Sequence, residues 1–442
     1  MNSKEIAPDF CYQSLISRFR KCRLQTEQLC QPLEVEDYGL QAVAETSPVK
    51  WHLAHTSWFF ETFILEKYEA NFTSFDKNFS YLFNSYYNGV GKPFLRSKRG
   101  LLSRPTVKAV FEYRRAISER IEKLFQGLAD SSPKALYLLE LGINHEQQHQ
   151  ELLLTDLLYN WYQNPLYPAY KKPALQEPIM ANLNSNLSEP AKLEWVTQKG
   201  GLVTIGKADD GSFAFDNEYP RHQVFIKDFL VADRLVTNRE YLAFIDDKGY
   251  QRPEFWLSDG WAKIQEKRWQ APLYWSQGQQ GNWFHYGYYG LQPLDLASPV
   301  SNISAYEADA FARWAQSRLM TEAEWELIAA QQEVQGNFIE SDALKPLAAG
   351  ANQISANRGD LAVQQLYGDL WEWIASSYSP YPGFKAAAGA VGEYNGKFMC
   401  NQLVLRGGSC VTSCDHMRSS YRNFFYPEAR WQFSGIRLAK DL

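Results

Sequence analysis

Two histidines, His145 and His149, stand four residues apart in the stretch 144–151, which reads NHEQQHQE. In a helix this spacing brings both imidazoles to one face. Two imidazoles on one face supply half of a typical transition-metal site. The letters HExxH also match the zinc-protease signature, in which Glu146 would be the general base. A third ligand therefore decides between a hydrolase and an oxygen-using iron enzyme.

The third ligand has two possible sources. His52 and His55 open an earlier helical segment, and a helical bundle can bring one of them opposite the His145–His149 pair. Three protein ligands leave coordination positions open, which suits non-haem Fe(II). The protease alternative needs a ligand after His149, and the run QELLL that follows lacks the extended protease pattern. The remaining interpretation makes His52 and His55 ordinary core histidines.

Four helical segments are expected to position these histidines, at residues 12–30, 51–68, 106–128 and 132–162. Ser-Pro pairs at 47–48 and 132–133 are typical of an N-cap followed by proline at the first helical position. The helix count predicts a four-helix bundle. A long loop at 71–101 is rich in Tyr, Phe, Gly and Arg, and a loop of this length is usually functional.

A proline-rich linker is predicted at 164–192, between a first domain at 1–163 and a second at 193–442. The second domain is rich in tryptophan and in glycine-containing turns. Short strands are expected at 201–206 and 221–231, and helices at 237–246 and 304–316. This mixture predicts an α+β domain with much irregular structure.

The composition excludes several classes of protein. The net charge of −5 gives no electrostatic reason for a nucleic-acid partner. The first ten residues lack the apolar core of a signal peptide, and no apolar run is long enough to span a membrane. Six cysteines in 442 residues are too few for a disulfide framework. A reducing cytoplasm is the expected location, and it suits Fe(II).

Several segments together resemble one family, the sulfoxide synthases of ergothioneine biosynthesis (EgtB-like enzymes). The segment 48–61 (PVKWHLAHTSWFFE) is similar to their first-helix motif, and 145–151 matches their HxxxHxE motif. The second half resembles the formylglycine-generating-enzyme, or sulfatase-modifying, domain. The segments that carry this second resemblance are 213–218, 236–238, 318–326, 368–373, 406–409 and 435–439.

The resemblance implies a multidomain fold, with a DinB-like four-helix bundle joined to a C-type-lectin-like α+β domain. It implies that His55, His145 and His149 bind Fe(II), which leaves His52 structural. It also implies that the enzyme uses O2 to join a thiol to carbon 2 of the imidazole of N-α-trimethylhistidine (hercynine), giving a sulfoxide. The implied partners are small molecules: hercynine, cysteine and O2.

The residues matching the family's hercynine contacts lie in both halves. By resemblance, Gln148 contacts the hercynine imidazole and Asn423 holds the carboxylate. Phe424 lies near the trimethylammonium group, which cannot donate a hydrogen bond and is held by aromatic faces. Each could instead be an ordinary packing residue. Glu151 falls roughly 240° around the helix from His145, using about 100° per residue, so it fits a supporting role better than a ligand role.

The thiol substrate is indicated by two missing charges. Relatives that use γ-glutamylcysteine carry Asp and Arg where this chain has Phe425 and Ala429. The departure favours free cysteine, with Phe425 kept as a substrate-lining residue. Arg96 and Arg99, on the long loop, are candidates for the cysteine carboxylate, because a guanidinium offers it a bidentate fork. A solvated basic loop is the alternative.

Tyr86 and Tyr87 resemble the tyrosine pair of the cysteine-using branch, and either could donate a proton during turnover. Their alternative role is to pin the loop to the bundle. Cys410 and Cys414 do not match the placement of the catalytic cysteines of formylglycine-generating enzymes, and we interpret them as buried small residues. Other functions left open are a 5-histidylcysteine sulfoxide synthase of ovothiol biosynthesis, a selenoneine synthase and a non-catalytic binding module.

Overall fold

The computed structural model describes residues 12–128, 132–171, 192–350 and 363–442. The chain divides into two compact units. The helical unit comprises Met1–Asn164, Ala208–Ala214 and Ala386–Tyr394, and the sheet unit comprises Pro165–Lys207, Phe215–Lys385 and Asn395–Leu442. Two short segments from beyond residue 193, within the predicted second domain, therefore belong to the helical unit. The predicted proline-rich linker lies mostly outside the described residues. Among the described helices, none combines the length and apolarity needed to cross a bilayer.

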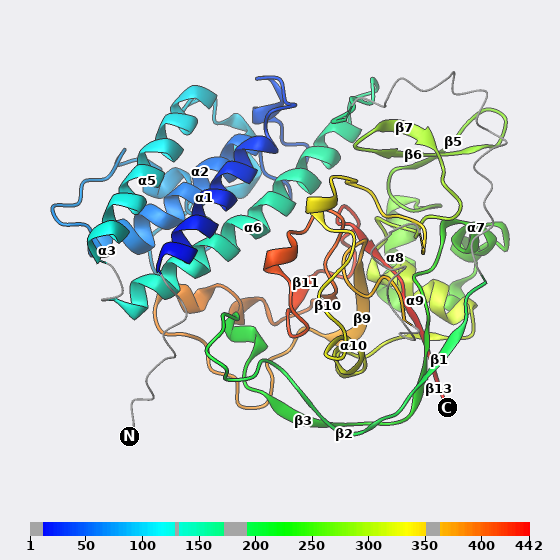
Figure 1. The fold of residues 1–442 in the computed structure, drawn as a ribbon. Helices are drawn as coiled ribbons and strands as arrows, with labels where there is room; N and C mark the ends of the chain where they lie inside the picture. Colours follow the sequence, from blue (N-terminus) through cyan, green and yellow to red (C-terminus); the bar gives the residue numbers. More distant parts are fainter. Residues whose placement is uncertain (1–11, 129–131, 172–191, 351–362) are drawn as a thin grey trace. The chain divides into compact units, whose positions relative to one another are not determined.

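Four long helices build the helical unit and lie side by side in Figure 1: α1 (Tyr12–Gln28), α2 (Val49–Phe60), α5 (Val107–Leu128) and α6 (Pro133–Tyr162). These are the four helices predicted from the sequence. Every residue of α2 is buried, so α2 is the central helix. The segment predicted as one helix at 51–68 continues beyond α2 as a π-helical turn, η2 (Glu61–Leu65), and a last turn, α3 (Glu66–Tyr68).

The two Ser-Pro pairs behave differently. Ser132 caps α6 as predicted, because its side chain accepts the N–H of Ala135 and Pro133 is the first helical residue. Ser47 was expected to cap α2, but the N-cap is Pro48, whose side chain cannot accept a hydrogen bond. The hydroxyl of Ser47 instead accepts a hydrogen bond from Arg99. The loop before α2 is thereby fastened to the long loop.

The long loop between α2 and α5 is ordered by short helical turns. These are α4 (Phe79–Leu82) and the 3-10 turn η3 (Arg96–Leu101), and a further 3-10 turn, η1 (Asp37–Gly39), precedes α2. The side chain of Asn84 donates to the carbonyl groups of Tyr87 and Gly91, which closes the middle of the loop on itself. The loop therefore holds its aromatic and basic side chains in fixed positions.

The described residues of the sheet unit form two four-stranded sheets and two smaller ones. The first sheet has the order β1 (Trp195–Gln198), β4 (Phe229–Ala232), β13 (Leu438–Asp441) and β8 (Arg318–Leu319) and is antiparallel. The second has the order β11 (Asn423–Phe425), β10 (Leu403–Arg406), β9 (Trp371–Ser377) and β12 (Ser434–Gly435), with β12 parallel to β9. The smaller sheets are the hairpin β2 (Gly201–Ile205) and β3 (His222–Ile226), and β5 (Trp275–Gln277), β6 (Trp283–Gly287) and β7 (Gly290–Pro293).

In the part of the unit that the structure describes, four helices accompany these sheets: α7 (Asn238–Asp246), α8 (Ser258–Lys267), α9 (Ala305–Trp314) and α10 (Glu322–Ala329). Short 3-10 turns connect the elements at Asp216–Glu218, Gly249–Gln251, Pro253–Phe255, Ile339–Ser341, Gly396–Phe398 and Cys414–His416, and a further turn, Ala390–Glu393, belongs to the helical unit. Three of the helices, α7, α9 and α10, begin with capping boxes, in which a hydroxyl and a glutamate satisfy each other's backbone N–H groups. The predicted helices at 237–246 and 304–316 match α7 and α9. The predicted strand at 221–231 is two strands, β3 and β4, because β3 pairs with β2 while β4 pairs with β1 and β13 in another sheet.

Buried ion pairs occupy the core of the sheet unit. Arg437 donates to Glu372 at 2.9–3.1 Å, and both side chains are fully shielded from solvent. Arg406 pairs with Glu322 and Glu326. These arginines and glutamates belong to the sequence segments that carry the second resemblance. These segments therefore help to hold the unit together, because their arginines and glutamates pair with one another in the core. A buried charge is strongly destabilising unless it is paired.

Candidate functional site

Three predicted ligands meet in the helical unit. His55 comes from α2, and His145 and His149 lie one turn apart on α6. Their ring centroids are 4.6–4.9 Å apart, and one nitrogen from each ring lies within 4.8 Å of the others. Within the described part of the chain, these three side chains lie close enough together to hold one metal ion. The structure therefore brings together the three histidines that the sequence proposed.

The free nitrogen atoms of these rings fit a metal ion. His55 Nδ1 lies 2.6 Å from the carbonyl oxygen of Phe83, and because a carbonyl can only accept, this nitrogen carries the proton. The other nitrogen of His55, Nε2, is buried without a hydrogen-bond partner, as are both nitrogens of His145. Buried polar atoms without partners are rare in folded proteins. A metal ion bound through one nitrogen of each imidazole would satisfy Nε2 of His55 and one nitrogen of His145.

The protein interior keeps these histidines neutral. Burial lowers the pKa of His145 to about 3, and it lowers the pKa of His55 and His149 well below the usual value of 6.5. Burial also lowers the pKa of the neighbouring His52, although Asp156 opposes the shift. Neutral imidazoles present lone pairs at neutral pH, as metal ligation requires.

Aromatic rings fix the orientation of His55. The Trp51 ring stacks on His55 with centroids 4.5 Å apart, and Trp58 stacks on the imidazole at 5.3 Å. The guanidinium of Arg99 lies 3.4 Å from the centroid of the Trp51 ring. This is a cation–π contact, which strengthens when water is excluded. The stack links the long loop directly to a candidate ligand.

Glu146, the presumed base of a zinc protease, has a different role. Its side chain is fully buried and accepts hydrogen bonds from Arg23 and Arg114 at 2.9 Å each, and from Thr26 at 2.7 Å. Burial alone would raise the pKa of Glu146, but the two guanidinium groups outweigh it and lower the pKa to about 2. A carboxylate engaged in this way is not available as a general base. The arrangement follows from helix geometry, because a residue next to His145 is rotated about 100° away from the ligand face.

The tyrosine pair lies in the helical unit. Tyr86 and Tyr87 stack on each other at 5.1 Å, and Tyr87 also contacts the ring of Trp58 at 5.6 Å. Burial raises the pKa of both phenols, so both keep their protons at neutral pH. Sequence reasoning missed a third tyrosine, Tyr394, whose ring lies 5.8 Å from that of His145 and 6.2–6.4 Å from those of the pair. No sequence signal pointed to it, because it comes from the second half of the chain.

The two candidate arginines differ in their environments. Arg96 is exposed and donates to the carbonyl oxygen of Glu45. Arg99 is only 4% exposed, and its hydrogen bonds go to the hydroxyl groups of Ser47 and Ser85 rather than to a carboxylate. Burial lowers the pKa of Arg99 well below its usual value. A buried guanidinium held by neutral partners is suited to receive an anion.

The remaining predicted residues are less closely tied to the histidines. Gln148 is half-buried on α6, and Glu151 is buried on the same helix outside the three-histidine group. Asn423, Phe424 and Phe425 form β11 in the sheet unit. Their place at the histidine site stays a prediction.

The contacts of β11 and of the cysteines are local to the sheet unit. The ring of Phe424 stacks on Tyr378 with centroids 4.0 Å apart, and Asn423 Oδ1 accepts the N–H of Phe424. Cys410 is fully buried, as predicted for a small core residue. Cys414 is only partly buried, because it lies at a 3-10 turn, and its thiol donates to the carbonyl oxygen of Val334.

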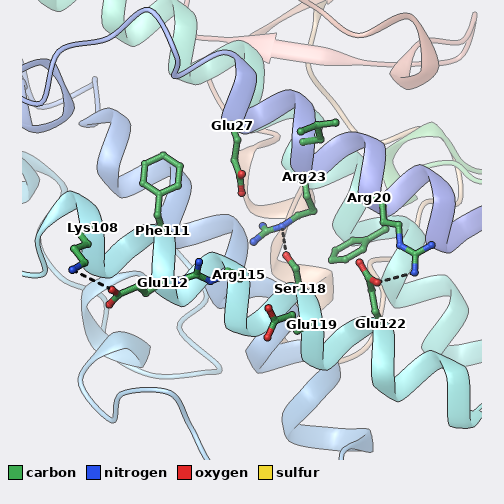
Figure 2. A pocket seen from close by; sticks show the side chains of 12 residues that line it. Arg20, Arg23, Glu27, Lys108, Phe111, Glu112, Arg115, Ser118, Glu119 and Glu122 are labelled. Atoms are coloured by element: carbon green, nitrogen blue, oxygen red, sulfur yellow. Dashed lines mark hydrogen bonds and ion pairs between the residues drawn. The ribbon is translucent and has the colours of Figure 1, made fainter.

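A separate groove of about 550 Å³ lies between α1 and α5. Figure 2 shows that charged side chains of both signs line it. Arg20 pairs with Glu122 at 2.7 Å, and Arg23 donates to Ser118 on the groove wall while also reaching the buried Glu146. The ion pairs Arg20–Glu122 and Lys108–Glu112 neutralise part of the charge along the groove.

Comparisons with known proteins place these observations in context. The DinB superfamily model matches residues 18–153, and the model of the sulfatase-modifying factor enzyme 1-like domain matches residues 183–442. These matches confirm the predicted combination of a DinB-like helical bundle with a C-type-lectin-like α+β domain.

Three curated relatives bear the name hercynine oxygenase. The protein of Mycolicibacterium smegmatis is 33% identical over 327 residues, which cover 68% of this chain and 71% of the relative. The proteins of Mycolicibacterium thermoresistibile and Mycobacterium tuberculosis are 34% and 33% identical, over 53% of this chain in each case. The chain spans 55% and 58% of the lengths of these two relatives.

Proposed function

This chain belongs to the hercynine oxygenase family of enzymes, and from that premise we propose that it joins cysteine to hercynine with Fe(II) and O2. The product is hercynylcysteine sulfoxide, an intermediate of ergothioneine biosynthesis. One observation carries the proposal: three neutral histidines converge in the bundle, and the two fully buried ones, His55 and His145, present nitrogen atoms that have no protein partner.

The proposed reaction balances. The C–H bond at carbon 2 of the hercynine imidazole and the S–H bond of cysteine break, a C–S bond forms, and the sulfur gains one oxygen atom. These changes remove four electrons from the two substrates. Molecular oxygen accepts all four, so that one of its atoms enters the sulfoxide and the other becomes water.

The proposed metal ligands are His55, His145 and His149. Fe(II) held by three imidazoles would supply the redox chemistry that O2 requires, with coordination positions left open for substrates. The protein's own part is to keep the rings neutral and correctly turned. Burial keeps the rings neutral, and the Trp51 and Trp58 rings that stack on His55 fix the orientation of its imidazole.

The cysteine carboxylate is assigned to Arg99, with Arg96 as a second contact. The support for Arg99 is its burial, its neutral hydrogen-bond partners and its place on Trp51, next to a proposed metal ligand. The carboxylate of a bound cysteine would form an ion pair with this buried guanidinium, whose hydrogen-bond partners are otherwise neutral. Recognition would then be strong, because charge-assisted hydrogen bonds in a dry site are strong.

Tyr86 or Tyr87 is proposed as the proton donor during turnover. Both phenols keep their protons at neutral pH, and Tyr87 contacts the Trp58 ring that stacks on His55. The proposed hercynine contacts are Gln148 with the imidazole, Asn423 with the carboxylate and Phe424 with the trimethylammonium group, and Phe425 is proposed as a further substrate-lining residue. Aromatic faces suit a cation that cannot donate a hydrogen bond.

An oxygen-consumption assay tests the proposal. The protein is loaded anaerobically with Fe(II), and O2 uptake is followed with cysteine plus hercynine and with cysteine plus histidine. Uptake that requires hercynine, together with hercynylcysteine sulfoxide in the mass spectrum, is the expected result. Equal uptake with histidine would instead support a 5-histidylcysteine sulfoxide synthase. Uptake with neither pair would overturn the proposal.

A further inference from the structure

A chain of hydrogen bonds leads away from His149 into the protein. His149 Nδ1 lies 2.9 Å from His52 Nδ1, and His52 Nε2 lies 3.2 Å from Asp156 Oδ2. The same carboxylate oxygen accepts the backbone N–H of Ser47 at 2.7 Å. His52 and Asp156 are both at least 97% shielded from solvent. His52, which the resemblance left as a structural residue, therefore connects a proposed metal ligand to a buried carboxylate.

The chemistry of these groups fixes the direction of each hydrogen bond. An ionised carboxylate can only accept, so His52 Nε2 must donate to Asp156. In a neutral imidazole the other nitrogen then has no proton, and His52 Nδ1 must accept from His149 Nδ1. His149 is thereby held with its proton on Nδ1, which leaves the lone pair of Nε2 free for a metal ion.

We propose that Asp156 and His52 are positioning residues that select the metal-binding tautomer of His149 and increase its strength as a ligand. The inference rests on the three-histidine metal centre of the proposed function. Outer partners of this kind orient ligand rings and raise their basicity, and their loss typically lowers metal affinity about 10- to 100-fold. In the usual arrangement the ligand histidine donates directly to a carboxylate. Here the imidazole of His52 stands between the ligand His149 and the carboxylate of Asp156.

The fold explains why these groups meet. Asp156 lies seven residues after His149, so two turns of α6 bring both side chains to the same face. His52 stands one turn before the ligand His55 on α2. The two helices thus contribute two residues each to a row formed by His55, His149, His52 and Asp156. The loop before α2 closes the end of this row, through the N–H of Ser47.

Metal affinity measured without turnover tests the proposal. Apoprotein is titrated with Co(II) under anaerobic conditions, and the dissociation constant and the visible cobalt absorption bands are recorded. In Asp156→Asn the amide oxygen can still accept but the charge is lost, so we expect about 10-fold weaker binding and shifted bands. In His52→Phe the acceptor for His149 is lost, and about 10- to 100-fold weaker binding is expected. His52→Asn, whose side-chain oxygen can stand near the Nδ1 position, should recover part of the affinity.

A matched control separates positioning from general damage to the bundle. Glu61 is another buried acid of the helical unit, and it accepts hydrogen bonds from Tyr113 and from the N–H of Phe75. Glu61→Gln should lower thermal stability but leave Co(II) affinity and absorption bands as in the wild type. Equal losses of affinity in Glu61→Gln and Asp156→Asn would overturn the positioning role.

Nuclear magnetic resonance gives a second readout that needs no variant. In apoprotein carrying 15N-labelled histidine, long-range couplings within the rings distinguish the two tautomers. The expected result is His149 protonated on Nδ1 and His52 on Nε2. The opposite tautomers would overturn the proposal, as would wild-type Co(II) affinity and bands in both Asp156→Asn and His52→Phe. Failure of the wild type to bind Co(II) would instead refute the metal centre itself.

Discussion

Glu393 holds the backbone of Gly89, accepting its N–H at 2.7 Å, and it also accepts the N–H of Asn88 at 3.1 Å. Glu393 lies in the second half of the sequence, yet it belongs to the helical unit with the loop that it holds. The two N–H groups come directly after Tyr86 and Tyr87. A segment distant in sequence thus supports the proposed proton donors.

Replacing Glu393 with Ala should loosen this loop without disturbing the histidines. The variant loses two charge-assisted hydrogen bonds, each worth about 1.5–3 kcal/mol when intact. We expect faster hydrogen exchange at residues 84–91, at least about 10-fold slower sulfoxide formation and unchanged Fe(II) affinity. Glu254→Ala, which removes a partner of an exposed ion pair in the sheet unit, is the control. Unchanged exchange in the loop would contradict the anchoring role.

Phenylalanine variants of the tyrosine pair test which phenol acts during turnover. Tyr86→Phe and Tyr87→Phe each remove one hydroxyl group and keep the ring that packs the loop. If one of them supplies the proton, its variant should shift products from the sulfoxide toward dioxygenated cysteine. Mass spectrometry of both products gives the ratio. The same ratio in both variants and the wild type would remove this role from the pair.

Glu146 should be essential for stability rather than for catalysis. Glu146→Gln leaves the buried guanidinium of Arg23 without a negative partner, and Arg114 keeps only Glu27, at 3.6 Å. Breaking a buried pair in this way typically costs about 3–5 kcal/mol. The expected result is a large fall in the urea midpoint of the helical unit. A variant that unfolds like the wild type would show that the arginines find other partners.

Acid pH should affect the sheet unit through Asp369. Burial raises the pKa of Asp369 from 3.8 to about 6, although hydrogen bonds from Asn337 and the N–H of Leu347 oppose the shift. Between these pH values the folded protein binds more protons than the unfolded chain. The free energy of unfolding therefore falls as pH rises through this window, by about 3 kcal/mol from this group.

In the Asp369→Asn variant, the free energy of unfolding should not show this fall with rising pH. Asparagine suits the left-handed backbone at this position, where φ is 53°. Urea unfolding followed by tryptophan fluorescence at pH 4.5 and pH 7 measures the effect as the difference between variant and wild type. An identical change with pH in both proteins would show that Asp369 does not titrate in this window.

The sequence predicted the parts of the site that depend on local spacing. The four-residue separation of His145 and His149 requires only a helix, and breaker residues marked the ends of the long helices. Contacts between distant segments were not predictable. Asp156 looks like any polar residue on a helix, and Tyr394 lies in a loop of the second half. Only packing shows that Asp156 reaches His52 and that Tyr394 reaches His145.

Arg99 should control the affinity for the thiol substrate. Arg99→Lys keeps a positive charge but loses the planar fork and the broad contact with Trp51. We expect the KM for cysteine to rise at least about 10-fold, with the KM for hercynine nearly unchanged. Steady-state kinetics with each substrate varied in turn measures both values. Arg96→Lys, at an exposed position of the same loop, should have a smaller effect. Equal changes in both KM values would show that Arg99 supports the site as a whole rather than the cysteine carboxylate.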